Sequence, residues 1–391
     1  MALPDSRRSW GLVAVAFAVM LVVVGTGYSY GAVLPRLVDD LGIGAGTASA
    51  VFAATVFVFF VAGAPAGVLA DRFGARRLLL GGAAAAAVGL AVTSRANGPW
   101  ALVLGHGVLL GAAMATTFVP MLAVVASAFE RHRTAALGVA VSGIGVGTLT
   151  MAPLLAALAE WVGWRDAYQV IAGVVLVVLL AGAAVLPGRT SRPRQREQRG
   201  GPLREVMGSG DYRRLYLAQM LLAVALFVPF ALLPAFAQSL GVMAVPAAGL
   251  VGVLGLASVV GRLALSALAE RVGVVATYRA CYLLVASGFV LWLLPAAGHL
   301  ELLLFAVVFG LGYGGFVALL PAVVTHLFGL ARFGAMVGVL YTANAAGAAV
   351  GPWAAGAMVD RFGYTPAAVM GCAFGAAAFG VLRGVGRRPL P

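Results

Sequence analysis

One arginine, Arg262, lies within a long apolar stretch of the sequence. The stretch, residues 255–273, has the composition of a membrane-spanning helix, and Arg262 falls near mid-depth. A charge held in hydrocarbon costs several kcal/mol, so it marks a candidate functional site. A guanidinium group is planar and can donate two parallel hydrogen bonds to a carboxylate. We therefore expect Arg262 to bind an anion; the alternatives are pairing with backbone carbonyls or an unseen partner, and snorkelling to the membrane surface.

Small and polar residues accompany Arg262 along its helix. They recur at steps of three and four residues, the spacing that places side chains on one face of an α-helix. Such a face fits a cavity wall better than a surface against lipid. The residues are Gly252, Gly255, Ser258, Val259, Arg262 and Ser266.

Other polar side chains in apolar stretches are candidates for the same site, because buried polar groups inside a membrane need partners. These candidates are Tyr28, Tyr30, Thr117, Tyr313, Tyr341 and Asn344. His106 is a candidate carrier of a proton, although a hydrogen-bonded packing role is the simpler interpretation. No metal-ligand cluster or nucleophile motif stands out, so we expect no metal, no cofactor and no enzyme.

These residues must be positioned by helices that cross a membrane. The chain has 391 residues, is 62% hydrophobic and only 10% charged, and has a mean hydropathy of +1.02. Apolar runs of about twenty residues, enough to span a bilayer as helix, predict an all-α protein with twelve transmembrane helices. The runs are 11–34, 48–70, 78–95, 100–128, 135–158, 165–187, 214–238, 246–269, 275–295, 299–328, 334–357 and 364–382.

The basic residues, all arginines, predict the orientation of the chain. With the N-terminus inside, only Arg36, Arg95, Arg165 and Arg361 fall in outer loops, so both termini are expected to be cytoplasmic. The net charge of +13 is then a topology signal, and we expect no nucleic-acid partner. Cys281 and Cys372 fall inside predicted helices and imply no disulfide. We expect a multi-pass protein of the cell membrane, surrounded by lipid and functional as a monomer.

The twelve runs divide into two related halves. An Arg-, Gly- and Pro-rich segment, residues 188–213, predicts a cytoplasmic linker between halves at 1–187 and 214–391. Corresponding residues lie 200 positions apart, as Gly138 with Gly338 and Glu160 with Asp360 do. A duplicated six-helix unit of this kind places its substrate site between the halves, near the middle of the membrane, and exposes it to either side by rocking.

The segment after the second run carries a recognisable motif. Residues 67–77 read Gly-Val-Leu-Ala-Asp-Arg-Phe-Gly-Ala-Arg-Arg, and with the twelve-helix pattern they resemble the signature of the major facilitator superfamily. The resemblance covers the whole chain and implies a transporter. The resemblance implies that this segment forms a latch that holds one conformation of the transporter. The latch residues are Gly67, Asp71, Arg72, Gly74, Arg76 and Arg77. A solvated basic turn would explain the arginines, but not Asp71 and the paired glycines.

Residues 129–147, from Phe129 to Gly147, are similar to a basic, glycine-rich stretch of the monocarboxylate transporter family. In that family an arginine of the eighth helix holds the substrate carboxylate, and Arg262 occupies that place. The resemblance implies proton-coupled transport of a monocarboxylate of the lactate or pyruvate type. Ser258 stands where the family commonly has an aspartate one turn earlier, so the proton is expected to travel on the acid itself or on His106.

Other transporter classes fit the sequence less well. Oxalate:formate exchangers have a second cation in the eleventh helix, whereas residues 341–347 here contain none; one fixed charge suits a monoanion. A multidrug exporter would need an inward-facing carboxylate, but the acidic residues fall in loops or at helix ends. A carrier of a neutral solute remains an alternative, because a fold does not determine its substrate.

Overall fold

The computed structural model describes residues 6–130, 132–186, 203–294, 299–329 and 333–386, and within these ranges all regular elements are helical. The N-terminal half ends with α7. Its elements are α1 (Arg7–Tyr28), a 3-10 turn (Tyr30–Ala32), α2 (Leu34–Leu41), α3 (Ala45–Phe73), α4 (Ala75–Ser94), α5 (Pro99–Leu102), a π-helical segment (Val103–Leu110), α6 (Gly111–Ala128) and α7 (Arg133–Val185).

The C-terminal half follows the predicted linker. Residues 188–202 of the predicted linker lie outside the described residues, but its last part is helical. There Ser209 caps α9 by accepting a hydrogen bond from the Tyr212 backbone nitrogen at 3.3 Å. The elements of this half are α8 (Leu203–Gly208), α9 (Gly210–Leu226), α10 (Val228–Ser239), α11 (Ala244–Val272), α12 (Val274–Trp292), α13 (His299–Phe328), α14 (Phe333–Phe362) and α15 (Tyr364–Leu382).

The described residues include 10 helical segments that are long and apolar enough to cross a membrane. One of these, residues 135–185, is two helices joined at Gly163, whose φ of 81° and ψ of 157° break the helical backbone. The 30-residue α14 lies outside these ten. The arrangement agrees with the predicted all-α fold, while the count of twelve spans stays a prediction.

Four similar turns join neighbouring helices within the two halves. Each turn has a glycine with positive φ, three residues after an acidic residue. The φ angles are 85° at Gly74, 81° at Gly163, 96° at Gly273 and 76° at Gly363. Glycine is favoured here because a Cβ atom would strain a left-handed backbone. The recurrence of this turn in both halves agrees with the duplication predicted from the sequence.

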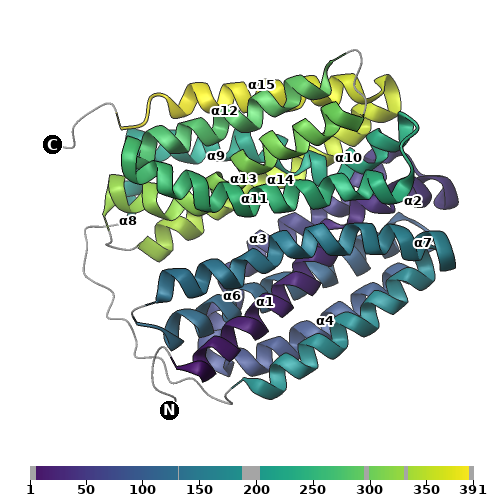
Figure 1. Ribbon diagram of the computed structural model, residues 1–391, viewed down its shortest axis with the longest axis horizontal. Coiled ribbons are helices and arrows are strands. Elements are labelled where there is room, and N and C mark those ends of the chain that lie inside the picture. The colour runs from purple at the N-terminus through teal and green to yellow at the C-terminus, as the bar shows by residue number, and fades with distance from the viewer. Residues whose placement is uncertain (1–5, 131, 187–202, 295–298, 330–332, 387–391) are drawn as a thin grey trace.

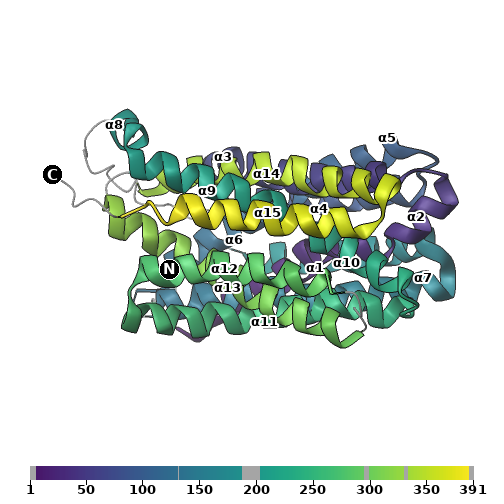
Figure 2. The same ribbon diagram turned by 90° about the horizontal axis from the view of Figure 1, so that it is seen from above.

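The two halves lie side by side, the N-terminal half below and the C-terminal half above in Figure 1. The start of α1 and the end of α15 lie at the same end of the helix bundle, which we call the terminal end. The opposite end, which we call the far end, contains α2 and the turn of α7 (Figures 1 and 2). The halves meet chiefly where α3 packs on α14 and α7 packs on α11. A site between the halves is therefore framed by these four helices.

The far end is closed by direct contacts between the halves. The Asp360 carboxylate, at the end of α14, accepts hydrogen bonds from the backbone nitrogens of Ala45 and Gly46 at 2.6 and 2.8 Å. These nitrogens begin α3, where unpaired N–H groups and the helix dipole favour a negative charge. Nearby, Gly31 lies against the carbonyl of Ala231 in α10, with no room for a side chain. Asp360 thus ties the two halves together at this end.

Replacing Asp360 by alanine should loosen the far end, because two charge-assisted hydrogen bonds between the halves are lost. Ser49 of α3, which is buried beside Gly356 of α14, is a suitable reporter when changed to cysteine in a variant whose Cys281 and Cys372 are alanine. We expect a membrane-impermeant maleimide added on the far side to label the reporter at least about tenfold faster in the Asp360→Ala variant.

The matched control is Asp40, an acidic residue at the same end that binds only within the N-terminal half. Its carboxylate accepts a hydrogen bond from Trp164 Nε1 at 2.6 Å and pairs with Arg165 at 3.2 Å. Asp40→Ala should leave the labelling rate within about twofold of its starting value. Equal rates in the two alanine variants would show that Asp360 does not hold the halves together.

Candidate functional site

A cavity lies between the two halves. It measures about 90 Å³, counted as the space that the centre of a water molecule can occupy, which is room for a small organic molecule. Its lining comes from both halves: Tyr28, Phe59, Phe60, Gly63, Phe118, Val119, Val141, Ile144, Leu226, Phe227, Arg262, Tyr313, Phe316, Val317, Leu320, Tyr341 and Asn344.

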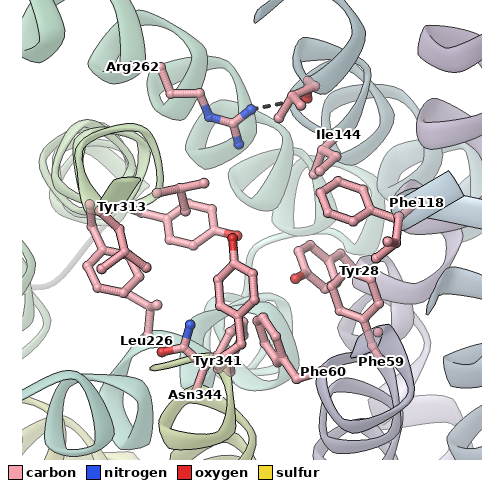
Figure 3. A pocket seen from close by; sticks show the side chains of 17 residues that line it. Tyr28, Phe59, Phe60, Phe118, Ile144, Leu226, Arg262, Tyr313, Tyr341 and Asn344 are labelled. Atoms are coloured by element: carbon pink, nitrogen blue, oxygen red, sulfur yellow. Dashed lines mark hydrogen bonds between the residues drawn. The ribbon is translucent and has the colours of Figure 1, made fainter. Parts of the chain in front are cut away.

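Arg262 provides the positive charge of this cavity. Its Nη1 donates a hydrogen bond to the backbone carbonyl of Val141, in α7 of the other half, at 3.1 Å. Its Nε is buried and has no hydrogen-bond partner. Figure 3 shows the guanidinium group directed into the space between the lining side chains. One N–H is therefore used by the predicted backbone pairing, and the Nε–H has no partner among the described residues.

No carboxylate balances this charge in the described part of the chain. The lining contains no acidic residue, and Arg262 forms no ion pair with any described side chain. A buried cation without a counter-ion is costly, and an anionic ligand would remove that cost. The cavity is thus electrostatically suited to an anion of one charge.

The small residues near Arg262 pack against helices instead of lining the cavity. Gly255 lies against Gly145 and Thr148 of α7, and Gly261 lies against the backbone of Leu311 in α13. The Ser258 hydroxyl donates to the Gly255 carbonyl at 2.7 Å. Of this face, Arg262 lines the cavity, while Gly255 and Ser258 take part in helix packing, which also selects small residues.

Two tyrosines flank the space beside Arg262, one from each half. Tyr28 at the end of α1 and Tyr313 of α13 line the cavity, and Phe230 packs between them, with ring centroids 4.8 Å from Tyr28 and 5.6 Å from Tyr313. Both side chains carry a hydroxyl group, and both line the cavity together with Arg262. They can supply a bound carboxylate with further hydrogen-bond donors.

Tyr341 and Asn344, both on α14, lie across the cavity from Arg262 (Figure 3). The Asn344 Oδ1 atom is buried without a hydrogen-bond partner. The Tyr341 ring lies 5.7 Å from Phe60 of α3, which links the two halves on this side. An unpartnered amide next to the space is a polar group that a substrate can satisfy.

Two predicted site residues lie outside the cavity lining. Tyr30 follows the break after α1, is fully buried, and packs against Phe52 and His106 with ring centroids 6.3 and 4.6 Å away. Thr117 donates its hydroxyl to the carbonyl of Ala113, in its own helix, at 2.8 Å. Neither side chain is in position to contact a molecule in the cavity.

His106 lies in the π-helical segment before α6 and is also outside the lining. Its Nδ1 is 2.8 Å from the Thr55 hydroxyl of α3, whereas its buried Nε2 has no partner. The Tyr30 and Tyr168 rings cover it, with centroids 4.6 and 6.1 Å away. These contacts favour the packing role, and the role in proton transfer stays a prediction.

Replacing His106 by asparagine should therefore leave the response of transport to a proton gradient unchanged. We expect the variant, and the partner variant Thr55→Val, each to lose about 1 kcal/mol of stability, because one buried hydrogen bond is removed. Thermal unfolding and gradient-driven uptake in proteoliposomes measure the two effects. Loss of the gradient response in His106→Asn alone would identify His106 as a proton carrier.

The predicted latch lies at the turn between α3 and α4. Gly74 makes the turn with its positive φ of 85°, and the four charged residues, Asp71, Arg72, Arg76 and Arg77, are exposed. The Arg72 guanidinium lies over the Phe73 ring at 5.4 Å, and Gly67 lies against Val119. Both contacts are within the N-terminal half, and holding one conformation stays a predicted role.

Comparisons with known proteins bear on both the fold and the site. A family model described as Major Facilitator Superfamily matches residues 15–297 and 215–391. Monocarboxylate transporter 3 of Rattus norvegicus is 30% identical over 376 residues, 91% of this chain and 75% of the relative. Monocarboxylate transporter 11 of Mus musculus is 30% identical over 392 residues, 94% and 85% of the two chains.

A solved structure supports the fold independently. The crystal structure of a mutant form of the nucleoside transporter NupG superposes with a TM-score of 0.76. The match covers 97% of this chain and 100% of the other, at 13% sequence identity. At this identity the likeness concerns the fold and carries no information on the substrate.

Proposed function

We propose that this chain, which belongs to the major facilitator superfamily, moves a small monocarboxylate of the lactate or pyruvate type across the membrane by alternating access. Its relatives are membrane transporters and not enzymes. The observation that carries the proposal is Arg262, a guanidinium group with an unpartnered, buried Nε in a cavity between the halves. A carboxylate is the ligand that matches both its charge and its planar geometry.

The number of charges in the cavity favours a monoanion. Arg262 is the one cation of the described lining, and Tyr341 and Asn344 stand on the helix opposite it. A dianion such as oxalate would keep one charge without a partner in a low-dielectric space, which is costly. Exchange of dicarboxylates is therefore the weaker alternative. A neutral solute would leave Arg262 uncompensated.

Arg262 also connects substrate binding to the movement of the halves. Its side chain belongs to α11 and reaches the Val141 carbonyl of α7 across the interface. Rocking of one half against the other must change this contact, because α7 and α11 lie on different halves. We propose that the carboxylate stays on Arg262 of the C-terminal half while the N-terminal half moves past it.

Proton coupling is the part of the proposal that depends on the resemblance of the sequence to proton-coupled carriers. No acidic side chain lines the cavity, so the described site contains no carboxylate that could carry the proton. We propose that a proton accompanies the substrate. Localisation in the cell membrane with both termini inside is likewise proposed from the distribution of arginines.

The experiment is uptake of labelled lactate, pyruvate and acetate into proteoliposomes that contain the purified chain, with and without an inward proton gradient. We expect saturable uptake of these acids, faster with the gradient, and no competition by oxalate. Uptake at the same rate with and without the gradient would exclude proton symport as the mechanism and leave uniport or exchange. Absence of carboxylate uptake by folded protein would refute the proposed substrate class.

A further inference from the structure

Aromatic side chains supply eight of the seventeen residues that line the cavity. We call six of them the aromatic collar: Phe59, Phe60, Phe118, Phe227, Phe316 and Tyr341. They come from α3 and α6 in one half, and from α13, α14 and the junction between α9 and α10 in the other. Figure 3 shows Phe59, Phe60 and Tyr341 across the cavity from Arg262. The cavity therefore has a charged side and an aromatic side.

Five of the six collar rings form a connected set centred on Phe60, while Phe316 packs on Tyr278 and Tyr282 behind it. The Phe60 ring centroid lies 5.2 Å from Phe59, 5.8 Å from Phe227 and 5.7 Å from Tyr341. Phe118 joins it through Phe59, at 5.6 Å. These pairs are tilted or edge-to-face, with interplanar angles between 42° and 75°. Aromatic pairs prefer such geometries, and another ring can extend the set in the same way.

A lactate or pyruvate molecule would use little of this surface. Its carboxylate would occupy Arg262, but its single methyl group is too small to cover the opposite wall. The rings would then stay in contact with water. The free energy that is gained when apolar surface is buried would be lost from substrate binding. A larger apolar body attached to the same carboxylate would bridge the charged side and the collar.

We propose, on the basis of the proposed carboxylate function, that the preferred substrates are monocarboxylates with an aromatic body, such as aryl-substituted 2-oxo acids. The carboxylate binds Arg262 and the aromatic ring packs in the collar. Because no acidic side chain lines the cavity, the corresponding aromatic amino acid has no carboxylate for its ammonium group and is a poor substrate.

The test compares four labelled or competing acids in proteoliposomes: phenylpyruvate, pyruvate, the branched aliphatic 4-methyl-2-oxopentanoate, and phenylalanine. We expect the half-saturating concentration of phenylpyruvate to be at least about tenfold below that of pyruvate. The reason is that a single extra methylene group in a hydrophobic pocket can already favour one substrate over another by about tenfold or more. The aliphatic acid should fall between them, and phenylalanine should not compete.

Phe60→Ala should reduce the preference for phenylpyruvate over pyruvate to within about threefold, because it removes the ring at the centre of the collar. The matched control is Phe57→Ala, a neighbour on α3 whose side chain is 40% exposed and outside the lining. It should keep the full preference. A fall in preference of the same size in both variants would exclude a specific role for the collar.

The outcomes separate this inference from the proposed function. Pyruvate favoured over phenylpyruvate, or the aliphatic acid bound as tightly as the aromatic one, would overturn the aromatic specificity and leave carboxylate transport intact. Strong competition by phenylalanine would also overturn it. If the folded wild type transports none of the carboxylates, the proposed function itself fails.

Discussion

Arg262→Ala is expected to reduce carboxylate uptake by at least about thirtyfold, because truncating one member of a buried charge pair costs about 2–5 kcal/mol. Arg262→Lys keeps the charge but replaces the planar pair of donors by a single ammonium. We therefore expect it to retain part of the activity, between alanine and wild type. Initial rates over a range of substrate concentrations in proteoliposomes measure both effects.

A loss of uptake is informative only if the variant folds. Arg165→Ala is the matched control, because Arg165 is a half-exposed arginine that pairs with Asp40 away from the cavity. It should transport within about twofold of wild type, since exposed ion pairs contribute at most about 1 kcal/mol. Unchanged carboxylate uptake in Arg262→Ala, with normal thermal unfolding, would rule out Arg262 as the anion site.

Gly255→Leu is expected to slow transport strongly by forcing apart the contact between the halves. A Cβ atom at Gly255 would overlap Thr148 and come within 2.7 Å of the Gly145 carbonyl oxygen in α7. That carbonyl belongs to helix backbone, which cannot move aside as a flexible side chain does. Because α7 and α11 must fit closely between the halves, we expect a loss of at least about tenfold in rate.

Gly249→Leu provides the comparison on the same helix. A Cβ atom there meets nothing within 4 Å, so the substitution adds the same volume without a clash. We expect uptake within about twofold of wild type. Equal activity of the two leucine variants would show that the approach of α11 to α7 at Gly255 is not required for transport.

Most of the fold could be predicted from apolar runs and their repetition, because a membrane-spanning helix must be both long and apolar. The run predicted at 100–128 corresponds to helical residues Pro99–Ala128. The helices at the end of the predicted linker were not foreseen, since the polar residues after 202 are also compatible with a loop, whereas Ser209 caps a helix. Polar composition alone does not distinguish the two.

The site was predictable where its chemistry is unusual for a membrane. Arg262 stood out because a buried charge is expensive. Gly63 precedes Asp71 by eight residues, as Arg262 precedes Glu270, and it lines the same cavity. The collar could not be recognised, since Phe60 and Phe227 resemble any apolar residue in so hydrophobic a chain. Tyr28 and Tyr30 were not separable either, although residues two positions apart point to different sides of a helix.

The central claim, one guanidinium group for one carboxylate, is tested most directly by comparing an acid with its neutral amide. Inhibition of uptake by propanoate and by propanamide is measured for the wild type and for Arg262→Ala. We expect the acid to inhibit the wild type at least about thirtyfold better than the amide, and less than about threefold better in the variant. A preference for the acid that survives unchanged without Arg262 would contradict the account.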